Sequence, residues 1–585
     1  MPLRRPAPLF LAALAAAILA APSPAQTTES ADPNDAYARN RIPASFAQGS
    51  PTSRVYVHVW NPPADAQETE RTKERLAREF GLRPGGSFEQ FHADAALAHV
   101  KRLPWVKEAE VRLYAIGAGG EVTVVLLVTL LGAEPKPVPP PAGAIGTGQL
   151  GQLPLLWKDD QGMVKLIVNP SAGAYVDRDA FLGNPGAFGS DPAMAGTLTH
   201  LEYGMELGIG GIFQLGDSPF FLFGTGSYVW SGTLGADIYS TTSSRGIGAW
   251  EDGYGGLLIA PHTSSSSFRL TVGRQKFSLN RNFQIGHVLG AANGGDRAAT
   301  DLSPRNAYDL VVDALYQVGR LSFQAFFARA NELPSSDSRT EYAGVNVAYT
   351  DSRTLDASLS LIGIPHSKGA YPLPDGSRLA REGLRSVNPR LKWSRAFGVP
   401  GLWLEGEWAH QWNTNYSMSA DGWGLWAGYT FEKTPWKPAL LYRYAVVTGD
   451  DPSTSTYERF DNLTGGVQRD WAQGMTMIKL STNRNLRTHR FEASLRPKGG
   501  LDLSVDCYDF WADTLNNLGG QPALATYASS HLGQEITPTL QWMVNANLFV
   551  QGLASYLVPG PGLRDTLPGP THVWQSYKLS LYWFY

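Results

Sequence analysis

The chain has 585 residues, of which 17% are charged, and its formal net charge of −3 at pH 7 is too mild to indicate a partner and gives no reason to expect nucleic-acid binding. Its single cysteine, Cys507, excludes an internal disulfide, so stability must come from packing and strand pairing. The 62 glycines and 11% aromatic residues are typical of a membrane β-barrel, although a soluble β-rich protein could share this composition.

The first 25 residues predict a cleaved secretory signal peptide. Arg4 and Arg5 precede an apolar run at residues 9–21, and Ser23-Pro24-Ala25 has the small residues of a cleavage site. A membrane anchor is the alternative, but the run is shorter than the roughly 20 residues that span a bilayer. No cysteine follows the run to carry a lipoprotein anchor, and no longer uncharged apolar run occurs later. Any membrane crossing must therefore use strands.

Residues 26–53 are a polar leader, and residues 54–132 predict a small α+β domain. Its elements follow the order β-α-α-β-β, with strands at 55–60, 109–115 and 121–131 and helices at 66–80 and 88–102. With the segments GLRPGGSF (81–88), LPWVKEAEV (103–111) and GEVTVV (120–125), this order resembles a POTRA domain. The resemblance implies contact with periplasmic export or scaffold proteins, or with a transported substrate. An unrelated small α+β domain is the alternative.

A Pro/Gly-rich linker at 133–160, which contains EPKPVPPP (134–141), separates this domain from residues 161–585. The second part holds eighteen amphipathic runs, many close to the ten residues that a tilted strand needs to cross a membrane. They lie at 164–168, 201–214, 220–230, 246–260, 268–277, 307–318, 321–330, 342–350, 355–364, 387–397, 402–412, 423–431, 439–447, 486–496, 501–511, 535–543, 548–557 and 576–585.

Short connections between these runs alternate with long ones, which include 170–198, 279–305, 365–385 and 448–485. Short periplasmic turns and long outer loops are typical of an outer-membrane barrel. A further run at 471–480 would break the alternation, so we assign it to the outer loop or to an extension of the next strand. The pattern predicts a mainly β fold, an 18-stranded antiparallel transmembrane β-barrel with a small N-terminal α+β domain.

The last run is typical of an outer-membrane protein. Tyr577, Leu579, Leu581, Trp583 and Tyr585 alternate with polar residues, and the chain ends on an aromatic side chain. One face of such a strand suits lipid, the other suits a polar lumen, and the aromatic end suits the membrane interface. We expect the bacterial outer membrane, with contacts to its lipid and lipopolysaccharide, and an N-terminal domain in the periplasm.

Four short motifs in the barrel resemble the alginate-export family of outer-membrane proteins. They are Gly273-Arg274-Gln275, LEGEW at 404–408, YRY at 442–444 followed by TGDD at 448–451, and HLGQE at 531–535. The resemblance implies an outer-membrane channel that exports an anionic, alginate-like polysaccharide by passive conduction. The POTRA-like unit is a departure from that family and points to a periplasmic partner or a substrate handover step.

Strand parity predicts which charged residues line the lumen. Candidate substrate-path residues are Arg269, Arg390, Lys392, Glu405, Glu407, Arg443, Arg490, Glu492 and Arg496, together with Arg274. Arg274 falls on lipid parity and needs a bulge or a rim position, because an Arg at the bilayer midplane costs about 2 to 4 kcal/mol. Two interpretations stay open: the basic residues guide an anionic sugar chain, or they form a structural ladder of cross-strand ion pairs.

Enzymatic activity is not expected. Glu405 and Glu407 are spaced like paired glycosidase carboxylates, but neighbouring cations would keep both ionised. None of the 11 histidines has metal-ligand spacing, and we expect no cofactor and no metal site. Asp450 and Asp451, in an outer loop, are expected to be solvated turn residues, with calcium binding there as the alternative. Two other functions stay open, a diffusion porin and a POTRA-dependent barrel for protein secretion or assembly. The latter requires a lumen-facing Arg-Gly-Phe or Arg-Gly-Tyr element late in the barrel, and neither occurs.

Overall fold

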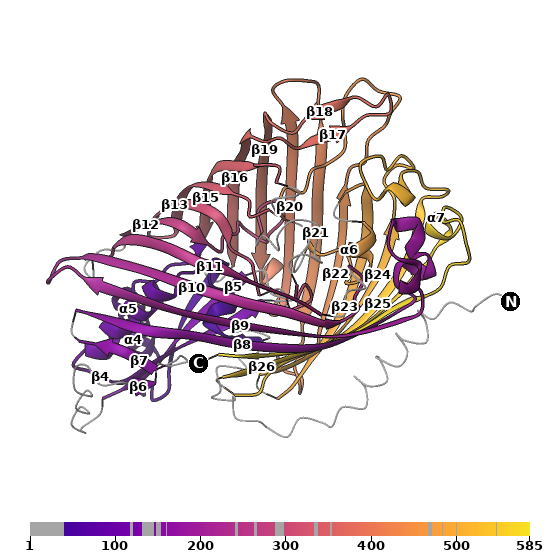
Figure 1. Cartoon of the computed structure of the whole chain (residues 1–585). Coiled ribbons are helices and arrows are strands. Elements are labelled where there is room, and N and C mark those ends of the chain that lie inside the picture. The colour runs from indigo at the N-terminus through magenta and orange to yellow at the C-terminus, as the bar shows by residue number, and fades with distance from the viewer. Residues whose placement is uncertain are drawn as a thin grey trace.

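The computed structural model describes residues 40–116, 121–131, 146–147, 154–159, 161–239, 244–261, 266–286, 298–302, 304–332, 337–351, 354–465, 471–481, 484–498, 500–545 and 547–584. Within these ranges the chain forms a large β-barrel and a small N-terminal domain (Figure 1). The expected signal peptide (1–25) and most of the expected linker (133–160) lie outside the described residues. Among the described residues, no helix is long and apolar enough to cross a membrane.

Eighteen of the described strands form a closed antiparallel barrel, which confirms the predicted fold class. The barrel closes where the last strand, β27, pairs with β8. Its strands are β8 (Gly162–Arg178), β9 (Thr197–Gln214), β10 (Phe220–Gly235), β11 (Ser244–Ile259), β12 (Ser266–Gln275), β13 (Tyr308–Val318), β14 (Leu321–Arg329), β15 (Glu341–Thr350), β16 (Leu355–His366), β19 (Leu384–Ser394), β20 (Leu402–Asn413), β21 (Ala420–Thr430), β22 (Ala439–Val447), β23 (Leu486–Lys498), β24 (Leu501–Trp511), β25 (His531–Met543), β26 (Leu548–Pro559) and β27 (Trp574–Trp583).

Smaller elements lie beside the barrel strands or in the connections between them. The strands β6 (Gly146–Thr147) and β7 (Pro154–Lys158) extend the sheet beside the first residues of β8. A hairpin of β17 (Ala370–Pro372) and β18 (Arg378–Ala380) stands in the long loop between β16 and β19. The long connections also hold the 3-10 turns η1 (Ala180–Gly183), η2 (Pro185–Phe188), η3 (Pro192–Met194) and η8 (Pro522–Leu524) and the short helices α6 (Met477–Leu480) and α7 (Pro561–Arg564), while η6 (Ala396–Gly398) forms a short turn.

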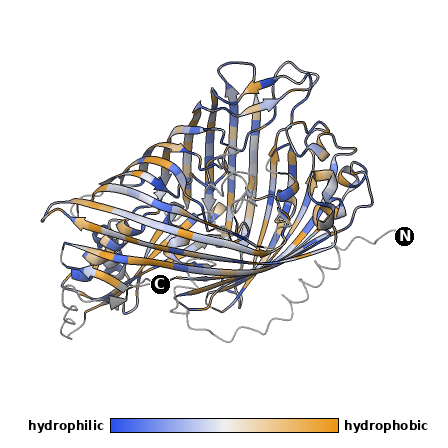
Figure 2. Ribbon diagram, in the orientation of Figure 1, coloured by the Kyte–Doolittle hydropathy of each residue, from blue (hydrophilic) through white to orange (hydrophobic). Residues whose placement is uncertain are grey.

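Side chains alternate between the two faces of the wall, as strand geometry requires. Along β19, Leu391 is 53% exposed on the outer face, whereas its neighbours Arg390 and Lys392 are buried on the inner face. Hydrophobic and hydrophilic residues alternate in the same way along many barrel strands (Figure 2). An apolar outer face is what the hydrocarbon core of a membrane accommodates.

Two segments differ from the sequence prediction. Strand β8 continues ten residues beyond the expected end at Val168, because its pairing with β9 runs through Pro170 and Gly173 to Arg178. The polar and turn-forming residues after Val168 lack the alternation typical of a strand, so the sequence prediction ended there. Pairing with β9 outweighs their low intrinsic preference for β structure. Residues 40–53, which we expected in the polar leader, form β1, α3 and the start of β2 in the N-terminal domain. The run at 471–480 is not a strand, as predicted.

The N-terminal domain is a mixed sheet covered by helices. Its described elements are β1 (Asn40–Ile42), α3 (Ala44–Ala47), β2 (Pro51–Val59), α4 (Ala66–Phe80), β3 (Gly86–Ser87), α5 (Gln90–Arg102), β4 (Val106–Ile116) and β5 (Glu121–Leu130). The sheet order is β1-β4-β5-β2-β3, with β2 parallel to β5. Helix α4 begins where the Asp65 carboxylate accepts from the Gln67 N–H, and ends at Gly81, whose φ of 70° suits glycine. Leu76, Phe80 and Val100 bury the helices against the sheet.

This domain lies inside the barrel, at the end where the short turns join the strands (Figure 1). The wall residue Arg269 donates from Nη1 to the Ser87 carbonyl oxygen over 2.8 Å, and Gln317 donates to the Pro84 carbonyl oxygen over 3.2 Å. The Ser322 hydroxyl donates to the Gly85 carbonyl oxygen. Backbone carbonyl oxygens of the segment 83–87 therefore receive hydrogen bonds from polar side chains of the inner wall. Buried carbonyl groups require such donors.

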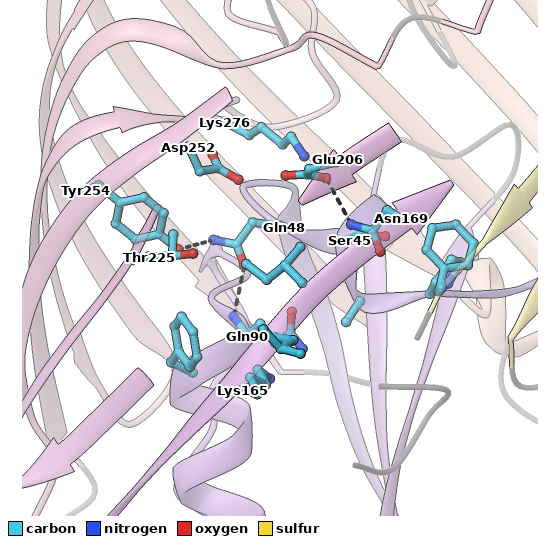
Figure 3. A pocket seen from close by; sticks show the side chains of 16 residues that line it. Ser45, Gln48, Gln90, Lys165, Asn169, Glu206, Thr225, Asp252, Tyr254 and Lys276 are labelled. Carbon is cyan, nitrogen blue, oxygen red and sulfur yellow. Dashed lines mark hydrogen bonds between the residues drawn. The ribbon is translucent and has the colours of Figure 1, made fainter. Parts of the chain in front are cut away.

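A second contact joins the start of the domain to the wall. Gln48 donates to the Tyr254 hydroxyl (3.2 Å) and accepts from the Gln90 backbone N–H (3.0 Å), beside a small cavity lined by polar and apolar side chains (Figure 3). Next to it, the Phe46 ring packs edge-on against Tyr582, with ring centroids 5.0 Å apart, and against Phe584. The C-terminal aromatic residues thus hold the N-terminal domain as well as the edge of the barrel.

A disulfide between Gly85→Cys and Ser322→Cys, in a Cys507→Ser background, should lock the domain in the barrel. A Cβ added at Gly85 lies 3.4 Å from the Ser322 Cβ, close to the roughly 3.5–4.5 Å of natural disulfides. The φ of +92° at Gly85 strains the cysteine by about 1 kcal/mol. We expect mild oxidation to form the bond, seen as a shift in electrophoretic mobility that reducing agent reverses.

The matched control pairs Ser322→Cys with Gly376→Cys, which has a similar positive φ in the β17–β18 hairpin and no neighbouring atoms within 4 Å of its added Cβ. This pair should stay reduced. Failure of the Gly85 pair to oxidise in the folded protein would contradict the placement of the domain.

Candidate functional site

The interior of the barrel is the candidate functional site, because most of the charged residues expected to line a substrate path are buried there. Those buried in the interior are Arg269, Arg390, Lys392, Glu405, Glu407, Arg443, Arg490 and Glu492. Their charged groups contact each other, the N-terminal domain or outer loops that fold inward. In the described part of the chain, these elements occupy the lumen.

A line of four alternating charges crosses the interior from the N-terminal domain to an outer loop. The Glu121 carboxylate of β5 contacts the Arg390 guanidinium, and Arg390 Nε donates over 2.6 Å to Glu405. Arg281 Nη1 donates over 2.5 Å to the other oxygen of Glu405. Glu121, Glu405 and Arg281 are each at least 96% buried, and Arg281 belongs to the loop after β12. We call these four residues the charge chain.

Lys392 gives Glu121 a second cation, at 3.5 Å. Burial by itself would raise the pKa of Glu121, but the positive charges of Arg390 and Lys392 outweigh that effect and lower the pKa below its usual range. The docked domain therefore presents an ionised carboxylate to two cations of the wall. Arg54, also in the N-terminal domain, donates to the hydroxyl of the wall residue Ser394 over 2.5 Å.

An aromatic stack lies beside the charge chain and joins two outer loops. The rings of Phe283 and Trp471 are parallel with centroids 3.6 Å apart, and Phe460 stacks on the other side of Phe283 at 5.3 Å. Trp471 Nε1 donates to Glu407 over 2.8 Å. Gly422 lets the stack approach the wall, because a Cβ there would lie 2.6 Å from the Phe283 ring.

The segment around α6 is tied to the wall through its backbone. The Glu535 carboxylate accepts from the N–H groups of Met475 (2.5 Å), Thr476 (3.1 Å) and Met477 (2.8 Å). Arg443 donates to Gln473 Oε1 over 2.6 Å and to the Ala472 carbonyl oxygen over 3.3 Å. The predicted path residue Arg443 therefore holds a loop in this structure.

Other predicted path residues form local pairs. Arg490 donates to Asp506 over 2.7 Å and to Glu492 over 2.9 Å. Arg269 donates to Asp313 over 2.9 Å in addition to its bond with the N-terminal domain. Arg496 lies at the short-turn end of β23, where the register shifts between Leu495 and Lys498. These pairs correspond to the structural ladder that the sequence left open.

Arg274 does not join the interior set. The register shifts between Gly273 and Gln275, so a bulge of the required kind is present at the end of β12. Arg274 Nε donates to the Trp250 carbonyl oxygen over 2.8 Å, and Nη1 lies 3.3 Å from Asp309. Asp309 also accepts from Arg329, and both of these side chains are more than two-fifths exposed. Arg274 therefore belongs to an ion-pair group on the outer surface.

Sequence reasoning missed four residues of this site, namely Glu121, Arg281, Phe283 and Trp471. Strand parity assigns faces only within the wall, and these residues come from the N-terminal domain or from loops. A signal that could have indicated them is the concentration of four inward-facing charges on β19 and β20, because buried charged groups need several polar partners each.

Comparison with known proteins identifies one family. The sequence profile described as Alginate export matches residues 258–572, just over half of the chain. Similar solved structures are OprD of Pseudomonas aeruginosa (12% identity, TM-score 0.42, covering 72% of this chain and 94% of that one) and OccK7 (OpdD) of the same organism (11%, 0.43, 73% and 99%). OccAB1 of Acinetobacter baumannii is another (10%, 0.44, 72% and 96%). No curated protein matches the chain.

Replacing Glu535 by Gln should loosen the segment around α6. The variant keeps the shape of the side chain but loses its charge and one acceptor oxygen, which costs about 1–3 kcal/mol when buried N–H groups lose their partner. We expect the amides of Met475, Thr476 and Met477 to exchange with deuterium roughly 10- to 100-fold faster, measured by mass spectrometry. Glu492→Gln, which breaks the pair with Arg490 elsewhere in the lumen, is the control. Equal exchange in both variants would contradict the anchoring role.

Proposed function

The chain belongs to the alginate export family of outer-membrane channels, and we propose that it conducts an anionic polysaccharide from the periplasm to the cell exterior through a barrel that its own N-terminal domain closes. The periplasmic end is the one that carries the short turns, and the domain fills that end. A polymer can pass only after the domain leaves. The structure then corresponds to the resting state of the channel.

The position of Glu121 is the observation that carries this proposal. Its carboxylate lies between Arg390 and Lys392, two cations of the inner wall. A uronate sugar bears the same group, and an Arg fork and a Lys ammonium both bind carboxylates. Withdrawal of the domain removes the Glu121 charge from these cations and leaves Lys392 and the remaining N–H groups of Arg390 to the polymer. In the closed state, the Glu121 carboxylate of the domain thus occupies the place that a carboxylate of the polymer would take.

The side of the N-terminal domain that faces away from the wall offers a surface for a periplasmic partner. Trp60 is 39% exposed, and the residues at 66–68 and 70–71 on α4 are exposed as well. We propose that an export or scaffold protein binds this side and withdraws the domain when polymer is delivered. This role agrees with the POTRA-like order of its elements.

The charge chain links the inner closure to the outer one. Arg390 contacts Glu121 of the domain and Glu405 of the wall, and Glu405 also binds Arg281 of the outer loop. When Glu121 leaves, the Arg390 guanidinium is free to take both oxygens of Glu405, which weakens the hold on Arg281. Release of the domain therefore favours release of the loop, and the lumen opens at both ends.

Glu121→Gln should raise the open probability of the full-length protein in planar bilayers. Removing one partner of a buried ion pair destabilises the docked state by about 3–5 kcal/mol. We expect an anion-selective open channel that uronate oligomers block and neutral dextran oligomers do not. Adding Arg390→Gln and Lys392→Gln should abolish both the anion selectivity and the block.

The control for this experiment is Glu110→Gln, which lies on β4 of the same domain and pairs with Arg112 within it. Its conductance should equal that of the wild type. A Glu121→Gln channel that is no more open than the wild type would contradict the closure mechanism. A cation-selective open channel would instead contradict the anionic substrate, and free passage of small solutes through the wild type would favour the porin.

Coupling between the two closures can be measured by a double-mutant cycle. We expect Glu121→Gln and Arg281→Gln to change the opening free energy non-additively, by about 0.5–3 kcal/mol, because both lie in one ion-pair network. Arg487→Gln, whose pair with Asp513 lies among the exposed outer loops, should add to Glu121→Gln without coupling. Strict additivity in both cycles would show that domain and loop open independently.

A further inference from the structure

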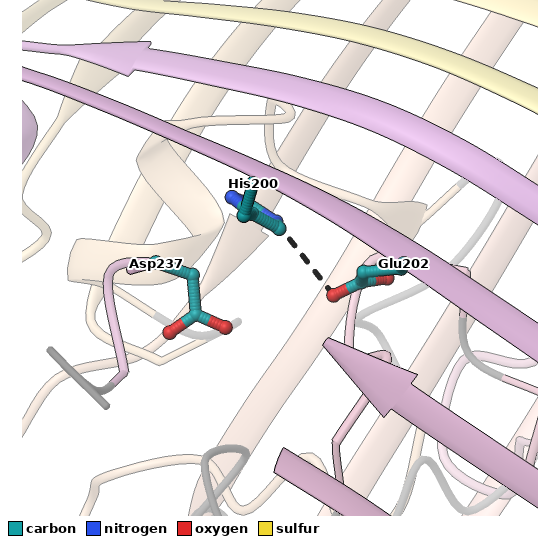
Figure 4. Close-up of side chains that lie close together, drawn as sticks. All are labelled: His200, Glu202 and Asp237. Atoms are coloured by element: carbon teal, nitrogen blue, oxygen red, sulfur yellow. Dashed lines mark ion pairs between the residues drawn. The ribbon is translucent and has the colours of Figure 1, made fainter. Parts of the chain in front are cut away.

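A compact group of metal-binding side chains lies in the lumen, separate from the charge chain. His200 and Glu202 project from the inner face of β9, and Asp237 follows the end of β10 (Figure 4). One ligand atom from each of the three lies within 4.8 Å of the others, and all three residues are buried. Asp301 comes from the outer loop after β12 and reaches the same histidine. We call these four residues the His200 cluster.

The second observation concerns the histidine itself. His200 is 1% exposed, and among the described residues neither of its ring nitrogens has a partner at hydrogen-bond geometry. Nε2 lies 3.4 Å from an Asp301 oxygen and 3.7 Å from a Glu202 oxygen. Ligands of a tetrahedral zinc ion at ~2.1 Å from the metal stand about 3.4 Å from one another. The distances from Nε2 to these two carboxylate oxygens are therefore close to a ligand–ligand spacing, and His200, Glu202 and Asp237 are near enough to one another to share an ion.

The surroundings hold the cluster in this geometry. The Tyr175 ring stacks on the imidazole, with centroids 5.0 Å apart and planes at 22°. The Leu302 N–H donates to Glu202 over 2.7 Å, and the Tyr239 N–H donates to Asp237 over 2.9 Å. Metal-binding side chains are commonly oriented by such outer contacts.

Two cations balance part of the negative charge. Arg245 pairs with Asp237, and Lys578 pairs with Asp301 through the oxygen that faces away from His200. A third cation, Lys479, lies near Asp237 and Asp301 but pairs with Asp177 over 3.7 Å, so four carboxylates and three cations leave one negative charge beside the histidine. A divalent cation or a proton on the imidazole would satisfy this group. One imidazole nitrogen with carboxylate oxygens suits zinc better than magnesium or calcium, which prefer oxygen ligands alone.

We propose that His200, Glu202 and Asp237 bind a zinc ion, with Asp301 beside the histidine. The ion joins β9 to the turn after β10, and Asp301 places the loop segment 298–302 against the same site although it lies 101 positions from His200 in the chain. That segment already receives support from Glu202 through its backbone. Zinc would therefore hold part of the long outer loop against the wall of the lumen.

The test uses the full-length protein in detergent, freed of its purification tag and of metal by a chelator. Isothermal titration with zinc chloride should give one site per chain, and zinc absorption spectroscopy should show one imidazole nitrogen among oxygen ligands. His200→Gln should weaken binding by about 10- to 100-fold or more. The control His531→Gln alters a histidine that pairs with a single carboxylate, Asp509, and should bind zinc as the wild type does.

Two outcomes would overturn the proposal. The first is the absence of a stoichiometric zinc site in the wild type, which would mean that a protonated His200 satisfies the carboxylates. The second is equal zinc affinity in His200→Gln and wild type, which would place the metal elsewhere. The spectroscopic result on the wild type decides the matter even where His200→Gln fails to fold. Conductance is not a readout here, so failure of this proposal leaves the proposed export function untouched.

Discussion

Burial of alternating charges inside the barrel is the interaction on which the rest of the structure depends. Glu121, Arg390, Glu405 and Arg281 come from the N-terminal domain, two wall strands and an outer loop, and each lies next to a charge of opposite sign. Removing one member leaves another buried without a partner, which is far more costly than losing an exposed pair. The domain and the loop are therefore held by one connected set of ion pairs.

The wall explains why the interior is polar and the outer face is not. A barrel strand faces lipid on one side and protein or water on the other, so within the hydrocarbon core of the membrane charges are tolerated only at inward positions. Here those positions serve as a binding surface for parts of the same chain: Arg269 and Gln317 hold backbone carbonyls of the N-terminal domain, and Glu535 holds three backbone N–H groups of an outer loop. Under the proposed function, the same donors and acceptors would bind the polymer once those segments leave.

Most of the barrel could be predicted from the sequence, because alternation of apolar and polar residues is a local property. The strands around Arg390, Glu405 and Arg443 have the expected faces, and the bulge that Arg274 requires is present. The prediction stopped short at β8, where Pro170 and Gly173 interrupt the alternation although pairing continues. It also missed that residues 40–53 fold with the domain, since α3 has only four residues and β1 three. So short an element carries too little periodicity to recognise.

The sequence by itself determined the class of the protein, the strands that cross the membrane and the side chains that point inward, because each depends on neighbours one or two residues apart. Only the tertiary structure decided what those side chains contact. Glu121 and Arg390 are 269 residues apart, and Phe283 and Trp471 are 188 apart, so no local pattern relates them. Closure of a barrel brings such distant segments into one enclosed space, and there the requirement that buried charges and polar groups be paired selects their partners.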